Sequence, residues 1–418
     1  MKIINNTLKK LMKTAEKDYF KYGLLIFVLL FSSGIEFIDT FSIIGNLKDL
    51  FFVIVPLVLF IIMCKKKQFN LDINIIFIFL AVFSMVSIIW SIDGFVTLKN
   101  SILFIGTTII AIYIGKNYNK KEIFKILLVW FIFLTFGNLL ISVLGIGNTF
   151  QADETRYTNV IKGMFKHRNL LGFYMTLGAS ISLWFMVNSK GNKKLQGISL
   201  INLLGSLALL LWSRSMTSIL LAALALGLVY LSRYKKFNLL MIYSIVPVLI
   251  VSVYTLVYQP DWFIDFLKAI GRSPTLTGRS FIWEGSLKAI SYKFLLGFGF
   301  NCFWTINPYS YYFVIPSYGW IPTHAHNGYL DLMLDFGIIG TMVALSLFPV
   351  ILNKVRKLMM VDNLINYKYI TYSLVYIVFI LIYNLMESPI IRQVSTVYIL
   401  LVIFTNVINS ISKEQQTK

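Results

Sequence analysis

Long apolar runs separated by short polar segments make up most of the chain. Runs at 23–37, 73–90 and 370–386 are long enough, or nearly so, to cross a hydrocarbon core of roughly 30 Å as helices. They are uniformly apolar and do not alternate as the strands of a membrane barrel would. The pattern therefore predicts an all-α polytopic membrane protein of about twelve transmembrane helices. The expected spans are 21–39, 47–63, 71–91, 98–115, 122–144, 168–187, 195–212, 215–232, 238–257, 337–353, 366–386 and 393–411.

The composition supports this class, and the distribution of charge orients the chain. Of the 418 residues, 57% are hydrophobic and only 13% are charged, which lies outside the range of soluble proteins. Most of the 38 Lys and Arg residues fall in the N-terminal segment, the tail and every second connection between the expected spans. These segments all lie on one side of the membrane, as the positive-inside rule describes for the cytoplasmic side. This distribution predicts that both termini are cytoplasmic. It also accounts for most of the formal charge of +20, so no nucleic-acid partner is expected.

The connections predict one integral membrane domain, 1–418, whose longer loops lie on the outer face. Residues 1–20 repeat apolar positions among lysines, which predicts an interfacial helix on the cytoplasmic leaflet. A smaller outer loop is expected at 145–167, and a large extracytoplasmic loop at 258–336, between spans 9 and 10. Apolar residues recur at helical spacing within 281–294, which predicts an amphipathic helix in the large loop. Because sites commonly lie on loops carried by a rigid scaffold, the large loop is the expected catalytic loop.

Histidines and cations gather in these outer loops. All three histidines, His167, His324 and His326, lie in them or at their edges. Cations on this face run against the positive-inside trend, which favours an anionic ligand as the reason for their presence. The candidates for binding that ligand are Lys166, Arg168, Arg214, Arg272 and Arg279.

Two of the arginines are placed to contact phosphate. Arg214 lies in the tight turn 212–215, where a guanidinium either snorkels to lipid head groups or binds phosphate through its planar fork. Arg279 follows Thr277 and Gly278 at the expected start of the amphipathic helix. There, its side chain and the free N–H groups of the helix could hold one anion together.

His326 is the candidate general base. The stretch His324-Ala325-His326-Asn327 leads into an expected span, and imidazole is the side chain best suited to take a proton from a hydroxyl near neutral pH. Two other interpretations stay open. One is a structural histidine that caps the helix, and the other is a zinc site formed by His324, His326 and His167, for which no further ligand has diagnostic spacing.

Several signatures of cofactor and metal chemistry are absent from the sequence. It has no Walker loop, no glycine-rich dinucleotide turn, no HExxH motif and no pair of acids in DxD spacing. We therefore expect no cofactor, and a metal-dependent nucleotide-sugar transferase is disfavoured. An enzyme that works on the outer face needs a donor that carries its own leaving group, and a lipid diphosphate does so.

Four sequence blocks occur in an order that points to one family. His326-Asn327 is followed, after nine residues, by Gly337 and Gly340. This spacing is similar to the His-[Asn/Ser/Gly]-x9-Gly-x-x-Gly signature of the O-antigen ligase and Wzy-type polymerase family of bacterial membrane glycosyltransferases. The other blocks that resemble this family are 163–172, 213–218 and 271–300, so the family-like region spans 163–340. The block at 271–300 is most similar to the exopolysaccharide polymerase branch.

The resemblance implies a GT-C-like enzyme of surface, capsular or exopolysaccharide synthesis in the bacterial cytoplasmic membrane. The implied reaction is a metal-independent, inverting transfer of a glycan from undecaprenyl diphosphate to an acceptor hydroxyl at an extracytoplasmic active site. Arg214 and Arg279 would bind the donor diphosphate, and His326 would be the base. Membrane lipid, a flippase and a chain-length regulator of the same pathway would be its partners. The residues then expected to contact the substrate are Arg272, His324, Asn327, His167, Arg168 and Lys166.

Three functions fit these features. The branch resemblance favours a polymerase, which adds the glycan to another lipid-linked repeat unit. A ligase, which transfers it to lipid A core or another surface acceptor, shares the same motifs. A transporter or flippase for the same lipid-linked glycan is disfavoured, because the expected spans hold few mid-membrane charges and the polar residues gather on one face.

Overall fold

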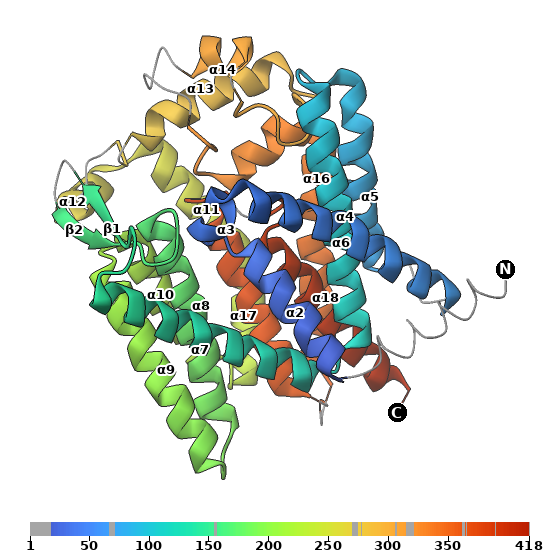
Figure 1. Cartoon of the computed structure of the whole chain (residues 1–418), viewed down its shortest axis with the longest axis vertical. Coiled ribbons are helices and arrows are strands. Elements are labelled where there is room, and N and C mark those ends of the chain that lie inside the picture. The colour runs from blue at the N-terminus through green and yellow to red at the C-terminus, as the bar shows by residue number, and fades with distance from the viewer. Residues whose placement is uncertain are drawn as a thin grey trace.

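The structure, a computed structural model, describes residues 18–66, 72–153, 157–269, 275–276, 278–305, 307–314, 322–361, 364, 366–388 and 390–417. These residues are mostly helical and include one two-stranded sheet (Figure 1). The helices are α2 (Asp18–Ser32), α3 (Glu36–Thr40), α4 (Ser42–Lys65), α5 (Asn74–Val86), η1 (Ser87–Trp90), α6 (Gly94–Asn117), α7 (Lys120–Leu144), α8 (Arg168–Asn188), α9 (Lys193–Trp212), α10 (Met216–Leu231), α11 (Lys235–Tyr258), α12 (Asp261–Ala269), α13 (Arg279–Tyr292), α14 (Pro308–Phe313), α16 (Gly328–Met359), α17 (Tyr367–Tyr383) and α18 (Thr396–Gln416). The strands are β1 (Phe150–Asp153) and β2 (Tyr157–Ile161).

The helices confirm the polytopic membrane class. Among the described residues, eight helices are long and apolar enough to cross a membrane, and four shorter apolar helices accompany them. Each of the expected spans overlaps one of these helices. Such segments become helices because a helix satisfies its backbone N–H and C=O groups internally, as hydrocarbon requires. The chain is therefore an all-α, multi-pass membrane protein, while the number of crossings and the GT-C-like arrangement stay predictions.

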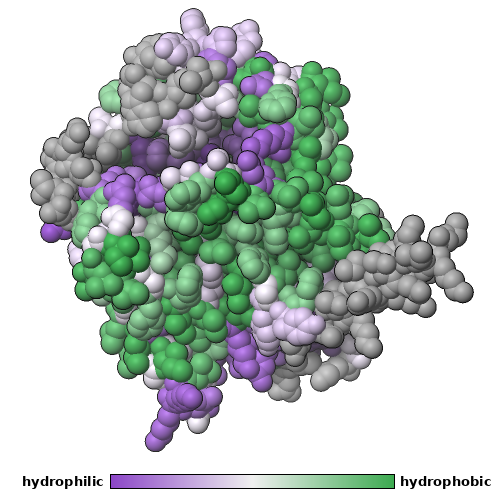
Figure 2. Space-filling view, viewed as in Figure 1, coloured by the Kyte–Doolittle hydropathy of each residue, from purple (hydrophilic) through white to green (hydrophobic). Residues whose placement is uncertain are grey.

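Apolar surface surrounds the middle of the molecule. The share of the most apolar stretch that is buried inside the protein is 89% in α18 and 78% in α8, but only 22% in α11. Accordingly, α11 exposes large apolar side chains such as Leu240, Ile250 and Val257. Figure 2 shows a broad hydrophobic belt on the face in view. Hydrophilic residues lie at the lower end of that face and around a recess beneath α13 and α14. A belt of this kind between two polar ends matches a lipid bilayer.

Buried polar contacts join the innermost helices to their neighbours. Asn74 on α5 and Asn406 on α18 exchange amide hydrogen bonds of 3.0 and 2.9 Å. The hydroxyl oxygens of Thr108 on α6 and Tyr398 on α18 lie 2.9 Å apart. Within a bilayer, such interhelical hydrogen bonds and close packing hold helices together, because lipid offers no hydrophobic driving force between them. They fix α6 and α18 relative to each other.

A backbone contact ties the turn after α13 to α16. Helix α16 is interrupted at Gly337, whose φ of 60° and ψ of −168° are adopted almost only by glycine. The turn after α13 satisfies the backbone groups that this interruption frees. The N–H of Phe298 donates to the carbonyl of Leu334 at 2.7 Å, and the N–H of Ile338 donates to the carbonyl of Phe294 at 2.9 Å.

Two glycines allow these backbones to approach so closely. A Cβ atom on Gly337 would lie 2.3 Å from the carbonyl oxygen of Leu295, and one on Gly297 would lie 2.7 Å from the amide nitrogen of Gly337. Both distances are too short for any side chain. The glycine that follows His326-Asn327 after nine residues therefore has a physical role, because it permits the break in α16 and the contact with the segment that follows α13.

Some elements of the outer loops were not predicted from hydropathy. The smaller loop contains a hairpin in which β1 pairs antiparallel with β2. The first expected span, 21–39, is broken after Ser32, where Gly34, with a φ of 71°, separates α2 from α3. The expected amphipathic helix is present as α13. Residues 18–20 begin α2, and the rest of the expected interfacial helix lies outside the described residues.

The contact at Gly337 gives a first testable prediction. Gly337→Ala should destabilise the protein by about 2–5 kcal/mol, because the new Cβ meets backbone and the glycine dihedral angles become strained. Gly227→Ala on α10 is the matched control, since nothing lies within 4 Å of its Cβ position. It should be neutral or stabilising by up to about 1 kcal/mol. Thermal unfolding in detergent measures both, and equal midpoints would refute the proposed role of Gly337.

Candidate active site

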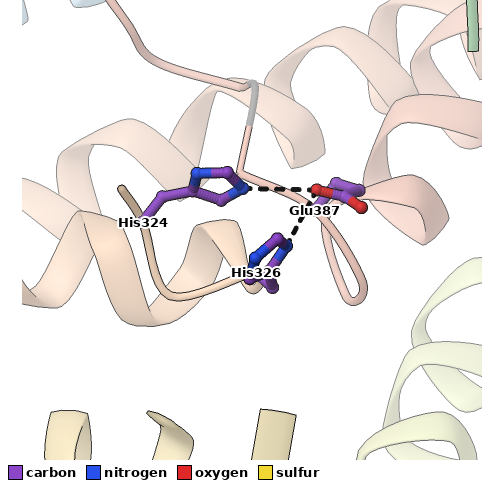
Figure 3. A group of neighbouring side chains, drawn as sticks. All are labelled: His324, His326 and Glu387. Atoms are coloured by element: carbon purple, nitrogen blue, oxygen red, sulfur yellow. Dashed lines mark hydrogen bonds and ion pairs between the residues drawn. The ribbon is translucent and has the colours of Figure 1, made fainter. Parts of the chain in front are cut away.

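One carboxylate holds the candidate base and an arginine expected to bind phosphate in a single cluster. Glu387 lies in the loop between α17 and α18, and its side chain is 12% exposed. Its Oε2 atom is 3.2 Å from Nδ1 of His326 and 3.4 Å from Nε2 of His324, as Figure 3 shows. Its Oε1 atom accepts a hydrogen bond of 2.9 Å from Nη2 of Arg279. The cluster thus joins α13, the segment before α16 and the α17–α18 loop.

The surroundings of Glu387 keep it ionised. Burial alone would raise the pKa of this carboxyl group, but hydrogen bonds from His324 and His326 and the charge of Arg279 hold the pKa well below its usual range. An ionised carboxylate accepts hydrogen bonds and donates none. Nδ1 of His326 therefore donates a hydrogen bond to Glu387, and in the neutral form of the ring Nε2 is the basic nitrogen.

The backbone before α16 is shaped to present His326. His326 has a φ of 52°, a left-handed conformation that is uncommon for a residue with a side chain and is concentrated at functional sites. Asn327 caps α16 directly after it, because its Oδ1 accepts hydrogen bonds from the N–H groups of Tyr329 and Leu330. From α13, the indole N–H of Trp283 donates to the carbonyl of Ala325 at 3.0 Å. The His326 side chain remains 27% exposed, so a substrate can reach it.

His324 supports the cluster from the other side. Its Nδ1 lies 2.8 Å from the hydroxyl of Thr323, and its Nε2 faces Glu387. Burial lowers the pKa of His324, the bond to Glu387 opposes that shift, and the charges of His326 and Arg392 lower the pKa further. His324 is therefore neutral near pH 7, with the Nε2 proton directed at Glu387. Arg392 also donates to the carbonyl of Thr323 at 3.1 Å.

Arg279 starts α13 and is mostly enclosed. Its side chain is 11% exposed, and Nη1 donates to the carbonyl of Met386 at 2.5 Å while Nη2 binds Glu387. A guanidinium has five N–H donors, so these two bonds leave donors for a ligand. Gly278, which precedes Arg279, has a φ of 85° and offers no capping side chain. The first N–H groups of α13 and the charge of Arg279 therefore lie at one place.

The block around His167 packs against the turn that carries Arg214. A Cβ on Gly172 of α8 would lie 2.5 Å from the hydroxyl of Ser218 on α10, so these helices touch there. The hydroxyl of Ser215 donates to Oδ1 of Asn169 at 3.0 Å. Arg214, in the turn before α10, is exposed and has a φ of 49°. The contact brings two of the family-like blocks together at one end of the bundle.

His167 caps α8 and lies within electrostatic reach of the Glu387 cluster. Its Nδ1 accepts a hydrogen bond of 3.2 Å from the N–H of Asn169, so the proton of the neutral ring is on Nε2. Desolvation lowers the pKa of His167, the charge of Glu387 opposes this shift, and the charges of Arg168 and Arg279 add to it. His167 and His326 therefore belong to one electrostatic environment.

The remaining candidate residues are more dispersed. Lys166 extends to Asp39 on α3, with 2.8 Å between Nζ and Oδ2, and its side chain is 55% exposed. Arg168 is half-buried at the first position of α8, where its backbone N–H donates to Gln151 on β1. Arg272 lies outside the described residues.

His324, His326 and Glu387 are also close enough to hold a metal ion. The three donor atoms lie within 4.8 Å of one another. However, Arg279 already neutralises the carboxylate, and a guanidinium 2.9 Å from a ligand oxygen opposes the binding of a divalent cation. The histidine N–H groups and the carboxylate also satisfy each other by hydrogen bonding. The arrangement fits a base oriented by a carboxylate better than it fits a metal centre.

Two residues of this site were missed in the sequence. Glu387 and Arg392 lie in the connection between the last two expected spans, outside the blocks that resemble the family. A signal was present for Glu387, because it is an acidic residue directly after an expected span on the predicted outer face. Nothing in its spacing, however, relates it to His326, which lies 61 residues earlier.

Comparisons with known proteins agree with the motifs. The family described as Wzy_C, O-Antigen ligase, matches residues 201–345, which include Arg214, Arg279 and His326. The chain is 24% identical over 286 residues to the exopolysaccharide production protein ExoQ of Rhizobium meliloti (strain 1021). That alignment covers 64% of this chain and 62% of the relative, so it spans less than two thirds of the relative's length. The resemblance to the O-antigen ligase and polymerase family is thereby confirmed.

The ionised state of Glu387 predicts how stability depends on pH. Glu387→Gln should cost about 3–5 kcal/mol at pH 7, because Arg279 loses its buried partner. The folded pKa of Glu387 lies below the unfolded value of about 4.3, so its contribution is present above that value and is lost as the pH falls through the folded pKa. The difference in unfolding midpoint between wild type and variant should therefore shrink only at acid pH.

Glu284→Gln on α13 provides the control for this experiment. Glu284 forms an exposed i,i+4 ion pair with Lys288, and exposed pairs contribute little. Its substitution should leave the midpoint nearly unchanged between pH 7 and pH 4. If Glu387→Gln behaved in the same way, Glu387 would not be an ionised, buried partner of Arg279.

Proposed function

We propose that this chain, whose residues 201–345 match the Wzy_C family of O-antigen ligases, is a polysaccharide polymerase of the bacterial cytoplasmic membrane. It would transfer a glycan from undecaprenyl diphosphate to the acceptor hydroxyl of another lipid-linked repeat unit, at an extracytoplasmic active site. The observation that carries the proposal is the Glu387–His326 pair beside Arg279. It places an oriented base and a cation at one end of an apolar bundle, where the head group of a lipid donor would lie.

The reaction follows from the protonation states of these groups. Neutral His326 takes the proton of the acceptor hydroxyl on Nε2, and the acceptor oxygen attacks the anomeric carbon of the donor sugar. The bond between that carbon and the diphosphate oxygen breaks, and undecaprenyl diphosphate leaves with the bonding electrons. Attack from the face opposite the leaving group inverts the anomeric centre. Glu387 stabilises the imidazolium that forms, as a carboxylate does in a nucleophile–base–carboxylate triad.

Cations are proposed to stabilise the departing diphosphate. Arg279 has donors left beside its bonds to Glu387 and Met386, and the partial positive charge of the N-terminus of α13 adds to that of the guanidinium. Arg214 lies on the exposed turn before α10 and supplies a second guanidinium. His324, His167, Asn327, Arg168, Lys166 and Arg272 are the further substrate contacts of this proposal, and no metal or cofactor takes part in it.

A ligase is the second candidate function. The matched family is described as an O-Antigen ligase, whereas the relative is described as an exopolysaccharide production protein. The two activities share donor and chemistry and differ in the acceptor, which would be lipid A core or another surface carrier for a ligase. A flippase and a chain-length regulator are the proposed protein partners of the polymerase.

The deciding experiment supplies purified protein in nanodiscs with undecaprenyl diphosphate-linked repeat units, without nucleotide and with a chelator. A ladder of lengthening lipid-linked glycan on a gel would establish a metal-free polymerase. Transfer only after addition of lipid A core or another acceptor would establish a ligase instead. Inactivity with every acceptor would favour a transporter of the same lipid.

The same assay tests the base. His326→Ala should abolish formation of the ladder, because the proposed base is lost, while abundance and the unfolding midpoint stay close to those of wild type. His326 is 27% exposed and contributes one contact to the cluster, so its loss should not unfold the protein. A full ladder from His326→Ala would remove this residue from the proposed role.

Arg214 gives an independent test of donor binding. Arg214→Ala should lower kcat/KM for the lipid-linked donor by about 10- to 100-fold, because a charge-assisted hydrogen bond to phosphate is lost. The matched control is Arg233→Ala at the opposite end of α10, where the guanidinium lies 3.7 Å from the ring centre of Tyr230. This control should retain activity. Equal rates for the two variants would show that Arg214 does not contact the donor.

A further inference from the structure

A polar cavity shares the loop between α17 and α18 with the Glu387 cluster and has no role in the mechanism above. It has a volume of about 310 Å³, at the lower end of the range for small-molecule sites. It is formed by the end of α2, by α3, by the starts of α4 and α6, and by the loop between α17 and α18. Its polar lining consists of Ser32, Asp39, Lys48, Asp49, Lys99, Asn100 and Gln393.

The charges that line this cavity are already paired. Lys48 is 2.5 Å from Asp39, and Lys99 is 3.0 Å from Asp49. Lys166, outside the lining, adds a second ammonium group to Asp39 at 2.8 Å. An anion would have to displace a carboxylate from each lysine, and a cation would have to displace a lysine from each carboxylate. Ligands with many neutral hydroxyl groups can bond to both members of a pair without breaking it.

One residue of the cavity lining has an acceptor with no partner among the described residues. The amide nitrogen of Gln393 donates to Oδ1 of Asn100 at 3.2 Å, but Gln393 Oε1 is buried and accepts no hydrogen bond from the described part of the chain. A buried acceptor left unsatisfied is costly and calls for a donor from a ligand or from water. The next residue, Val394, has a φ of 48°, which is strained for a β-branched side chain. The loop is therefore held in this shape despite its cost.

The cavity is connected to the candidate active site from two sides. The α17–α18 loop carries Glu387 of the catalytic cluster and, six residues later, Gln393 of the cavity. Between them, Arg392 donates to the carbonyl of Thr323 beside the histidines. On the other side, Lys166 binds Asp39 of the cavity and directly precedes His167.

From these observations we propose that the cavity is a carbohydrate subsite that binds a neutral sugar residue of the acceptor or growing glycan. This inference rests on the proposed glycan transferase function and extends it. On binding, the Gln393 amide turns so that Oε1 accepts from a hydroxyl of the sugar, while other hydroxyl groups bond to the Asp49–Lys99 pair. Phe31 and Leu103 in the lining provide apolar surface for the ring face of the sugar. Occupancy of this subsite would hold the acceptor chain at the end of the bundle where His326 lies.

The test measures binding separately from transfer. The probe is the repeat-unit oligosaccharide released by mild acid from the lipid-linked precursor of the producing cells, so that it carries no diphosphate. It is titrated against the full chain in nanodiscs and followed by saturation-transfer NMR. Gln393→Ala and Asp49→Ala should each weaken binding by about three- to tenfold, through loss of one or two hydrogen bonds. Asp265→Ala, which removes an exposed aspartate paired with Lys268, is the matched control and should bind as wild type does.

The possible results separate this proposal from the proposed function. If the His326→Ala variant bound the oligosaccharide as tightly as wild type does, the result would support the subsite, because the subsite does not need the base. Wild type that binds the oligosaccharide but forms no ladder would overturn the polymerase and leave the subsite. Formation of a ladder without binding of the free oligosaccharide, or equal binding by wild type and both cavity variants, would overturn the subsite. Displacement of the probe by inorganic pyrophosphate through Lys48 and Lys99 would also overturn it, in favour of a phosphate site.

Discussion

The buried carboxylate of Glu387 is the constraint on which the candidate site depends. An ionised group in an enclosed position costs several kcal/mol unless charged and hydrogen-bonding partners surround it. Here the partners are Arg279 from α13 and His324 and His326 from the segment before α16. Because Arg279 and the two histidines come from different parts of the chain, satisfying this one carboxylate brings the start of α13, the start of α16 and the α17–α18 loop together. The same contacts set the proton of His326 on Nδ1 and leave Nε2 basic.

The geometry of this cluster depends on backbone contacts between α16 and the segment after α13. The interruption of α16 at Gly337 gives up helical hydrogen bonds, and the segment after α13 replaces them through Phe294 and Phe298. Helix α13, which carries Arg279, is thereby tied to the helix that His326 precedes. A side chain at Gly297 or Gly337 would separate the two backbones. The glycine spacing of the family-like motif is therefore a packing requirement that positions His326, about three helical turns from Gly337.

A bilayer environment also explains where the charged residues lie. The exterior of the bundle is apolar around its middle, so charged side chains gather at its ends (Figure 2). Several cations at the end that carries the candidate site are paired with acids, as in Lys162–Glu36 and Lys166–Asp39, and if this end faces outward, as predicted, they oppose the usual topological preference. Pairing lowers the cost of keeping them there. The Glu387 cluster and the polar cavity lie at this end and share the loop between α17 and α18.

The sequence by itself determined the helical membrane class, the approximate bounds of the spans and the family-like motifs. Hydropathy is a local property, and a segment in lipid must satisfy its backbone locally. The sequence also indicated His326 and Arg279, because residue type and spacing mark them. It did not predict the β hairpin, the break at Ser32 or Glu387, and it did not show that Arg279 binds a carboxylate. Only the tertiary structure decided these contacts, since Glu387 and Arg279 are 108 residues apart and meet through the packing of the helices between them, which leaves no periodic trace in the sequence.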